Sequence, residues 1–229
     1  MTQSKMTNTK RRKSADIRKG NLQLILTVAE ERFAKYGYNA TTISSIAEQA
    51  KLPKSNVLYY FKTKEVLYRE VLINILKIWL VDMDEMNAEQ HPSEALRRYI
   101  LLKIKQSKEH ANASRIFASE LLHGAPFLQE KLHTELKDQF EKTCQVFREW
   151  IAKQWMKPVS PEHVLFMIWS STQAYADYEI QSSILMGKSK LDDNDFETGA
   201  EMICQIVLRG CGIKLLSEDH FHSKISLLQ

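Results

Sequence analysis

The sequence predicts an all-α protein with a small N-terminal helical domain and a larger C-terminal one. Glycine and proline, the residues that interrupt helices most strongly, number only 7 and 5 in 229 residues, which is well below their average share. Apolar residues recur every three or four positions through most of the chain, and this is the spacing of one helical face. No segment alternates apolar and polar residues as a half-buried strand would, so we expect no sheet.

The first helix is expected between two segments of different character. Residues 1–16 are polar and basic and show no periodicity, which predicts a disordered basic arm. Apolar residues return with helical spacing from Ile17 to Tyr36, and Gly37 follows where a glycine often ends a helix. This helix opens a domain that we expect to span residues 17–65.

Two short helices should follow the first. Thr41 and Thr42 can accept hydrogen bonds from free backbone N–H groups ahead of an apolar face over residues 43–50. Pro53 is tolerated in the first turn of a helix but not in its interior, so a third helix should run from there to Phe61.

A long fourth helix is predicted to connect the two domains. Thr63 can cap its start, and apolar residues from Leu67 to Met83 keep the helical period. In the C-terminal domain, expected over residues 66–214, most of the remaining prolines stand where new helices should begin. The predicted helical segments are 93–109, 112–123, 126–155, 161–187 and 195–214. The tail, residues 215–229, has no pattern that we can interpret.

Charge divides the chain into parts with different partners. Residues 1–65 hold 13 Lys and Arg against 5 Asp and Glu, a net charge of +8, whereas the rest of the chain has a net charge of −4. A basic head on a mildly acidic body suits a domain that approaches a polyanion. The run Lys10–Lys13 taken alone is equally compatible with a solvated tail.

Several classes of protein are not expected. No stretch of 18 uncharged apolar residues occurs, and the first 20 residues lack the apolar run of a secretory signal, so we expect a cytoplasmic protein without a membrane partner. Cys144, Cys204 and Cys211 lack disulfide or zinc spacing and are interpreted as packing residues. Neither a zinc-protease histidine pair nor a Gly-rich phosphate loop is present. We therefore expect no metal, no cofactor and no enzyme.

The second and third predicted helices form a helix-turn-helix, in which the second helix of the pair enters the major groove of DNA. The residues around it match a family pattern: GYNATTI at 37–43, IAEQA at 46–50, and LYYF at 58–61 with Lys64 and Glu65 close behind. Over roughly residues 20–68 the chain resembles the DNA-binding domain of TetR-family transcriptional regulators.

Roles in DNA binding follow from position and from this resemblance. The start of the third helix places Lys, Ser and Asn side chains where they can reach base edges, since Asn suits adenine and Lys suits guanine. Hydroxyl groups and a lysine nearby suit phosphate contacts. The candidates are Thr41, Thr42, Lys54, Ser55, Asn56, Tyr59, Tyr60 and Lys64. Alternatively, Thr42 only caps a helix, Tyr60 packs and Lys54 is solvated.

The turn departs from the family pattern. Where the family usually has Gly-Val-Ser, this chain has Lys51-Leu52-Pro53, which removes a flexible glycine and a capping serine. Pro53 can still start the helix and Lys51 adds a cation near the DNA, so we expect altered contacts rather than lost binding.

The C-terminal domain also carries a resemblance. The segments at 75–80, 114–126 and 166–178 look like those of pyrimidine-responsive repressors within the same family. That resemblance extends over most of the chain, and it implies a homodimer that is released from DNA by a small planar ligand such as uracil or thymine.

A candidate ligand site can be derived from the residues themselves. Trp169 and Gln173 stand four positions apart on one helical face, with Asp177 one turn later. The indole offers a flat apolar wall and the amide offers the donor and acceptor that an imide edge requires. Alternatively, Trp169 belongs to the core and Gln173 makes a structural hydrogen bond.

Four further residues are weaker candidates for this ligand site. Trp79 could supply a second wall, and three charged residues could supply polar contacts unless they form internal ion pairs. These candidates are Trp79, Lys103, Arg115 and Glu120.

The last two long segments carry more apolar residues than the core of one small helical bundle requires. These residues predict a four-helix dimer interface. They are Phe166, Met167, Tyr175, Tyr178, Met202, Ile206 and Leu208.

The sequence therefore predicts a ligand-responsive transcriptional repressor that binds a palindromic DNA operator as a homodimer. Three alternatives remain open. The protein could respond to a different small ligand, or it could bind DNA without sequence preference. An enzyme built on Glu120, His123 and Asp177 would need those three groups to meet in one pocket.

Overall fold

The computed structural model describes residues 2–213, with side chains from Asp16 onward, and every regular element in that range is helical. The all-α prediction is confirmed. The chain divides into two compact units, Met1–Asn74 and Ile75–Gln229. The boundary falls inside the fourth helix rather than at residue 65, because that helix packs its first turns into the N-terminal unit and contributes its later turns to the C-terminal unit. The predicted tail, 215–229, lies outside the described residues.

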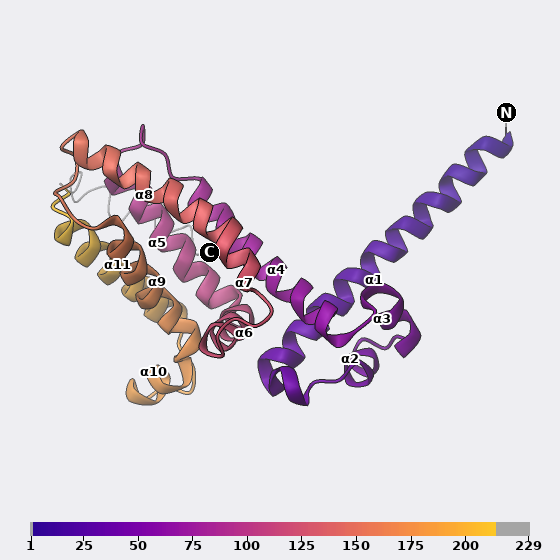
Figure 1. The fold of residues 1–229 in the computed structure, drawn as a ribbon. Helices are drawn as coiled ribbons and strands as arrows, with labels where there is room; N and C mark the ends of the chain where they lie inside the picture. The colour runs from indigo at the N-terminus through magenta and orange to yellow at the C-terminus, as the bar shows by residue number, and fades with distance from the viewer. Residues whose placement is uncertain (1, 214–229) are drawn as a thin grey trace. The chain divides into compact units, whose positions relative to one another are not determined.

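The N-terminal unit consists of α1 (Thr2–Ala40), α2 (Ile43–Gln49), α3 (Lys54–Phe61) and the start of α4 (Lys64–Asp84) (Figure 1). One buried side chain or more from each helix builds its core, as the pattern of apolar spacing predicts. The innermost of these are Ile25, Ala29, Phe33, Ile46, Val57, Phe61 and Leu67. The core therefore holds the α2–α3 pair against α1.

Helix α1 differs from the prediction at its start. Residues 2–16 were expected to form a disordered arm, but they form the first part of α1. The segment contains no proline and no glycine before Gly20, and its Lys, Arg and Met residues favour helix, so nothing local ends α1 on that side. At the other end Gly37 has φ 74° and ψ 172°, which interrupts the helix where a terminating glycine was predicted.

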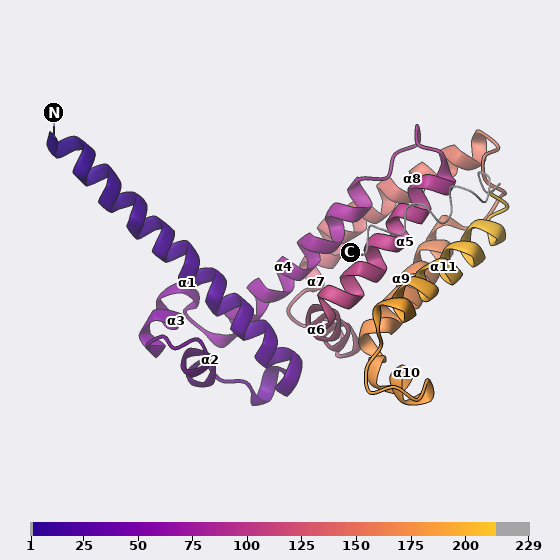
Figure 2. The same cartoon turned by 180° about the vertical axis from the view of Figure 1, so that it is seen from behind.

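The C-terminal unit is a helical bundle (Figures 1 and 2). After α4 it contains α5 (Pro92–Glu109), α6 (Ala111–Leu122), α7 (Gln129–Lys131), a π-helical turn η1 (Leu132–Leu136), α8 (Lys137–Ala152), α9 (Pro161–Asp177), α10 (Glu179–Leu185) and α11 (Asp193–Gly210). Helix α5 packs against both α9 and α11, and α9 also contacts α6, α8 and α11. Helices α5 and α9 are therefore the centre of the bundle.

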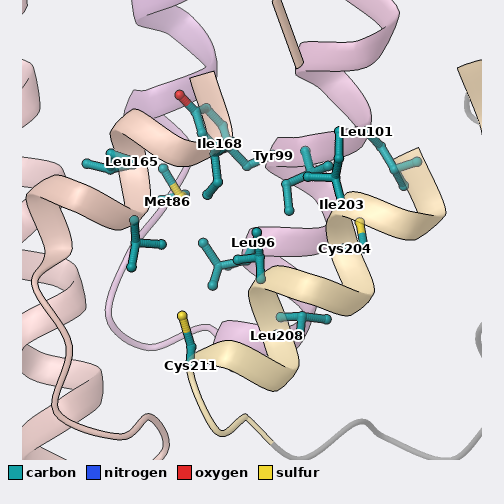
Figure 3. Packing of buried hydrophobic residues seen from close by; sticks show 14 of the residues in the cluster. Met86, Leu96, Tyr99, Leu101, Leu165, Ile168, Ile203, Cys204, Leu208 and Cys211 are labelled. Atoms are coloured by element: carbon teal, nitrogen blue, oxygen red, sulfur yellow. The ribbon is translucent and has the colours of Figure 1, made fainter. Parts of the chain in front are cut away.

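The bundle core is made by side chains from the facing sides of these helices. Figure 3 shows Leu96 and Tyr99 of α5 meeting Ile168 of α9 and Ile203 and Leu208 of α11. Cys144, Cys204 and Cys211 are free and buried, and their packing role is confirmed. Burial raises the pKa of the Cys204 thiol to about 12, so the protonated, unreactive form is favoured.

Local signals account for several helix starts. Pro92 occupies the first turn of α5, and Pro161 occupies that of α9, where Ser160 accepts from the backbone N–H of His163. Two expectations were wrong in detail. Pro126 lies in a turn ahead of α7 instead of starting a helix, and the predicted helix 161–187 breaks at Tyr178, whose ψ of 23° is non-helical. No glycine or proline marks that break, so the sequence did not reveal it.

Candidate nucleic-acid interface and small-molecule site

The α2–turn–α3 pair begins with the predicted cap. The backbone N–H of Ser45 donates to the Thr42 hydroxyl oxygen at 3.1 Å, and the N–H of Thr42 donates back to the Ser45 hydroxyl at 3.2 Å. This reciprocal pair satisfies two backbone donors at the start of α2. Thr42 remains exposed, so capping leaves it accessible to a phosphate.

Thr41 is a correction to the predicted interface. Its side chain is fully buried, and its hydroxyl donates to the backbone carbonyls of Gly37 at 2.8 Å and Arg32 at 3.2 Å. A hydroxyl used in this way cannot contact a phosphate. Thr41 instead ties the end of α1 to the start of α2, so the two adjacent threonines have different roles.

The turn between α2 and α3 forms with Lys51, Leu52 and Pro53. Lys51 has φ 54°, in the left-handed region that glycine occupies without strain. The next residue, Leu52, donates its N–H to the carbonyl of Ala47 at 3.0 Å, which closes the end of α2. Pro53 precedes the first helical residue of α3 and makes no side-chain cap. The turn therefore forms without the glycine and the serine.

The start of α3 presents the predicted reading residues. Lys54 and Ser55 are exposed and Asn56 is half-buried, at the helix end where free backbone N–H groups and the helix dipole favour an anion. Further along α3, Val57 and Phe61 are buried, which turns the opposite face of the helix toward the core. The apolar anchor thus fixes which residues of α3 remain accessible.

Aromatic residues extend this surface. Tyr59 is 63% exposed, and its ring lies edge-on to the half-buried ring of Tyr60 at 5.3 Å between centroids. The guanidinium of Arg18 on α1 lies 5.9 Å from the centroid of the Tyr59 ring. The sequence analysis missed Arg18. Only the packing of α1 beside α3 brings it to this surface, although its place in the basic head was a signal.

Lys64 has a structural contact that the prediction did not include. Its ammonium donates to the backbone carbonyl of Tyr38 at 2.9 Å and lies 4.2 Å from the centroid of the Tyr38 ring. The predicted phosphate contact would have to compete with these interactions. We therefore assign Lys64 a structural role, in which it connects the end of α1 to the start of α4.

The C-terminal unit contains a small hollow of about 10 Å³, partly open to solvent, which is about the space of one water molecule. It brings together three of the predicted ligand residues from three helices: Trp79 of α4, Lys103 of α5 and Gln173 of α9. The other lining residues are Gln106, Ser107, His110 and Ser114. Sequence reasoning missed these four, although Lys103, Gln106, Ser107 and His110 recur at helical spacing along α5 and its C-cap.

Trp79 forms one wall of the hollow. Its side chain is 9% exposed, and its ring meets the ring of Phe117 on α6 edge-on at 4.3 Å between centroids. This contact fixes the orientation of the indole, so one face of a rigid aromatic plane borders the cavity.

Lys103 is the unusual member of the site. Its side chain is 5% exposed, and its ammonium donates to Oε1 of Gln106 at 3.0 Å and lies 5.2 Å from the centroid of the Trp79 ring. Burial lowers the pKa of Lys103 to about 8, although the negative charge of Asp82 acts in the opposite direction. The site thus contains a buried cation, and burying this charge costs free energy.

Three predicted ligand residues lie elsewhere. The indole N–H of Trp169 donates to the Tyr99 hydroxyl at 2.7 Å, and its ring packs on Phe140, so the core interpretation holds for it. Trp169 and Gln173 do share a helical face, but they are one turn apart along α9 and only Gln173 reaches the hollow.

The two remaining charged candidates have structural partners. Arg115 donates to the carbonyl of Ala176 at 3.2 Å and pairs with Glu179 at 2.9 Å. Glu120 is 3% exposed and accepts from the backbone N–H of Phe127 at 2.6 Å. Both side chains therefore make contacts within the protein, which attach α6 to the end of α9, to α10 and to the turn after α6.

The three groups of the enzyme alternative do not meet in one pocket. Glu120 contacts Phe127, His123 bonds to the carbonyl of Ser119 at 2.7 Å, and Asp177 accepts from the Ser114 hydroxyl at 2.7 Å. These three groups have separate partners rather than a common pocket. Among residues 16–213, whose side chains the structure describes, no group of three or more His, Cys, Asp or Glu residues could hold a metal ion.

Exposed apolar side chains occur on each of α9, α10 and α11. Phe166, Met167, Tyr178, Met202 and Ile206 are exposed, in agreement with the predicted dimer residues. Leu208 is a correction, because it is fully buried in the core, and Tyr175 is half-buried against Phe196. Ile180, Ile184 and Leu185 of α10 add exposed apolar area that the sequence analysis did not single out.

Comparison with known proteins identifies relatives for both units. Residues 25–71 match the family model described as bacterial regulatory proteins, tetR family, and residues 72–214 match the model described as YcdC-like protein, C-terminal region. The chain is 36% identical over 210 residues to the HTH-type transcriptional regulator RutR of Escherichia coli strain K12, covering 92% of this chain and 98% of the relative.

Two further proteins resemble the chain, one in a short stretch of sequence and the other in fold. Over 48 residues, 21% of this chain and 26% of the relative, it is 52% identical to the HTH-type transcriptional regulator QacR of Staphylococcus aureus. A solved tetR-family regulatory protein from Rhodococcus RHA1 shares the fold with a TM-score of 0.68 at 18% identity, over 85% of this chain and 98% of that one. Among the described residues, no helix has the length and apolar character needed to cross a membrane.

Proposed function

The chain belongs to the TetR family of transcriptional regulators, and on that basis we propose that it is a homodimeric repressor that leaves a palindromic operator when a pyrimidine base binds. The observation that carries the DNA-binding part is the exposed start of α3, which presents Lys54, Ser55 and Asn56 in a unit of strong positive charge. The observation that carries the effector part is the hollow beside Trp79 and Gln173.

In this proposal, residues at the start of α3 recognise the DNA bases, and residues around it contact phosphates that position the protein on the DNA. Asn56 and Lys54 can donate to base edges in the major groove, while Thr42 and Tyr60 can contact phosphates. Arg18 beside Tyr59 adds a cation at the same surface. A symmetric dimer would present two such surfaces to half-sites one helical turn of DNA apart, which requires a palindromic operator.

In this proposal, the dimer interface consists of the exposed apolar side chains of α9, α10 and α11. Met202 and Ile206 lie one turn apart on α11, and each is 56% exposed. Burying such a surface against a symmetry mate gives the two-helix contribution of a four-helix interface. The family commonly dimerises, and this surface has the composition that an interface core requires.

The side chains around the hollow suit a pyrimidine base in chemistry, and binding requires the hollow to widen from its volume of about 10 Å³. The indole of Trp79 offers a flat apolar wall, and the amide of Gln173 offers a donor and an acceptor for an imide edge. The resemblance of three segments to pyrimidine-responsive repressors supports this ligand class. Binding can lower operator affinity only if the ligand favours a conformation that fits the operator less well, and α4 contains residues of both units.

Calorimetric titration with uracil, thymine and a purine tests the effector. Gln173→Ala should weaken pyrimidine binding by about 1–3 kcal/mol, because the imide edge loses its hydrogen-bond partner in the hollow. Gln145→Ala, on the exposed side of α8 and away from the hollow, is the matched control and should bind like wild type. Equal binding by wild type and Gln173→Ala would move the site elsewhere.

Two alternative functions give different results in the same set of experiments. If no pyrimidine binds wild type while a specific operator is still bound, the protein is a TetR-family repressor with a different ligand. If random duplexes compete as well as any selected site, it is a non-specific DNA binder. Selection of binding sites from random DNA, followed by competition at fixed salt, separates these outcomes.

A further inference from the structure

Lys103 is a buried cation beside a cavity, and the described structure gives it no carboxylate at ion-pair distance. Its ammonium has one hydrogen bond, to Oε1 of Gln106, and lies over the Trp79 ring. An ammonium has three donors, and a buried donor without an acceptor costs free energy. The geometry therefore leaves donor capacity next to the hollow.

The polar groups around the hollow have unequal freedom to bind a ligand. The Ser107 hydroxyl donates to the carbonyl of Thr172 at 2.8 Å, and the Ser114 hydroxyl donates to Asp177 at 2.7 Å. No carboxylate lines the hollow, whereas Lys103 and His110 do. A site with these groups favours a ligand edge rich in oxygen acceptors.

Gln106 connects Lys103 to α4. Its side-chain NH₂ donates to the carboxylate of Asp82 and to the backbone carbonyl of Ile78 at 3.4 Å, while its Oε1 accepts from Lys103. One amide thus bridges the cation on α5 and two groups on α4. A change at the ammonium alters what Gln106 can offer to α4.

We propose that Lys103 selects the effector by donating to an oxygen on a planar ring, and that Gln106 transmits this contact to α4. When the ring oxygen accepts from one of the remaining N–H donors, the ammonium is drawn toward the ligand and away from Oε1 of Gln106, which weakens the bridge to Ile78 and Asp82. The selected class is planar heterocycles with an exocyclic oxygen on the edge that faces α5. This inference rests on the proposed function, which places an effector in the hollow.

The first test removes the ammonium and the ligand oxygens in turn. Lys103→Met is compared with Lys105→Met, a matched control on the same helix whose lysine pairs with Glu109 outside the hollow. Each protein is titrated by calorimetry with uracil, 2-pyrimidinone and 4-pyrimidinone, the last two of which lack one oxygen each. The affinities of wild type and Lys103→Met, each for uracil and for the compound lacking one oxygen, form a thermodynamic cycle. This cycle isolates the contact between Lys103 and that oxygen.

Wild type and Lys105→Met should bind uracil roughly 10- to 100-fold more tightly than the compound lacking the selected oxygen. Lys103→Met should lose the same factor for uracil and show no further loss when that oxygen is removed. An unchanged oxygen dependence in Lys103→Met overturns the inference and leaves the proposed function standing. If wild type binds none of the three compounds, both the inference and the pyrimidine proposal fail.

The pH dependence gives a readout that a structural role would not move. Uracil affinity of wild type should fall by up to about 10-fold between pH 7 and 9, because Lys103, with its pKa of about 8, loses its proton there. The charged or titratable groups near it are Asp82 on α4, which Arg98 also faces, His110 between α5 and α6, and Asp177 beside Ser114.

Lys103→Met in the same buffers corrects for ionisation of the ligand and of these neighbouring groups. Relative to wild type, the uracil affinity of Lys103→Met should change little between pH 7 and 9. An equal pH dependence in both proteins contradicts the role of Lys103.

Gln106→Leu tests the connection to α4. Operator affinity is measured without ligand and at saturating uracil, so a change in uracil affinity does not enter the ratio. The decrease caused by uracil should be large in wild type and in the control Gln145→Leu, and at least 5-fold smaller in Gln106→Leu. The same decrease in all three proteins overturns the role of Gln106.

Discussion

The ammonium of Lys64 donates to the backbone carbonyl of Tyr38, 26 residues earlier, at 2.9 Å, and covers the Tyr38 ring at 4.2 Å from its centroid. The Tyr38 ring in turn lies 4.8 Å from that of Tyr68 on α4. One lysine thus joins the end of α1 to the start of α4. Since α2 and α3 lie between these points in the chain, this contact closes the helix-turn-helix unit.

Lys64→Met should destabilise the N-terminal unit by about 1 kcal/mol, since a partly exposed charge-assisted hydrogen bond is lost. Because the ammonium is already committed to Tyr38, the slope of operator affinity against salt should stay unchanged. The free energy of unfolding follows from urea titration monitored by circular dichroism, and the slope from binding at several salt concentrations. A slope reduced by about 1 would instead restore the phosphate contact.

Asn56→Ala should relax the preference for one base pair in each half-site, because a base-edge contact is removed. The expected cost is about 1–3 kcal/mol on the preferred operator and much less on operators changed at that position. Binding to a panel of singly substituted operators measures this. Thr42→Val, which removes a hydroxyl suited to phosphate, should weaken all operators by similar factors, and a sequence-dependent loss there would contradict the assignment.

Lys51→Gly should stabilise the protein by about 0.5–1 kcal/mol, because φ 54° is strained for lysine and free of strain for glycine. The midpoint of urea unfolding should rise with no change in its slope. Lys35→Gly, in the regular part of α1, should have the opposite sign. A lower midpoint for Lys51→Gly would mean that the lysine makes a compensating contact in the turn.

Lys103→Met should stabilise the C-terminal unit at pH 7 while impairing effector binding. The pKa of Lys103 in the folded state is about 8, below the ordinary lysine value of 10.5, so burying the charged form costs up to about 3 kcal/mol at pH 7. The gain in Lys103→Met is smaller by the cost of leaving Oε1 of Gln106 without its donor. The folded state loses its proton first as pH rises, so wild type gains stability between pH 8 and 10.5.

The difference in unfolding free energy between Lys103→Met and wild type should therefore shrink over that pH range. Urea titrations at pH 7, 8.5 and 10 measure it. A difference that is constant with pH would mean that burial does not lower the pKa of Lys103.

Met202→Glu combined with Ile206→Glu should convert the dimer to monomers, since two charges would be buried at the centre of the α11 surface. Dimer affinity should fall by more than about 100-fold, as measured by sedimentation velocity. Val81→Glu, at a position that is 59% exposed on α4, is the control for adding a charge at an exposed apolar site. Loss of the dimer in the control alone would place the interface on α4.

The sequence by itself determined the features that depend on neighbouring residues. Thr42 caps α2 and Thr63 caps α4, as predicted, because a cap joins atoms only three residues apart. The helix-turn-helix and the family followed from a compact motif for the same reason. The signal at Gly37 was also local, since its positive φ ends the regular run of α1.

Tertiary structure alone decided which residues of a helical face reach a site. Spacing placed Trp169 and Gln173 on one face, but the partner at Trp169 is Tyr99, and only Gln173 meets Trp79 and Lys103. Likewise, adjacent threonines differ because packing buries one of them completely. Helical periodicity specifies a direction around the axis, whereas burial and hydrogen bonding depend on which distant helix covers that direction, and no local pattern encodes this.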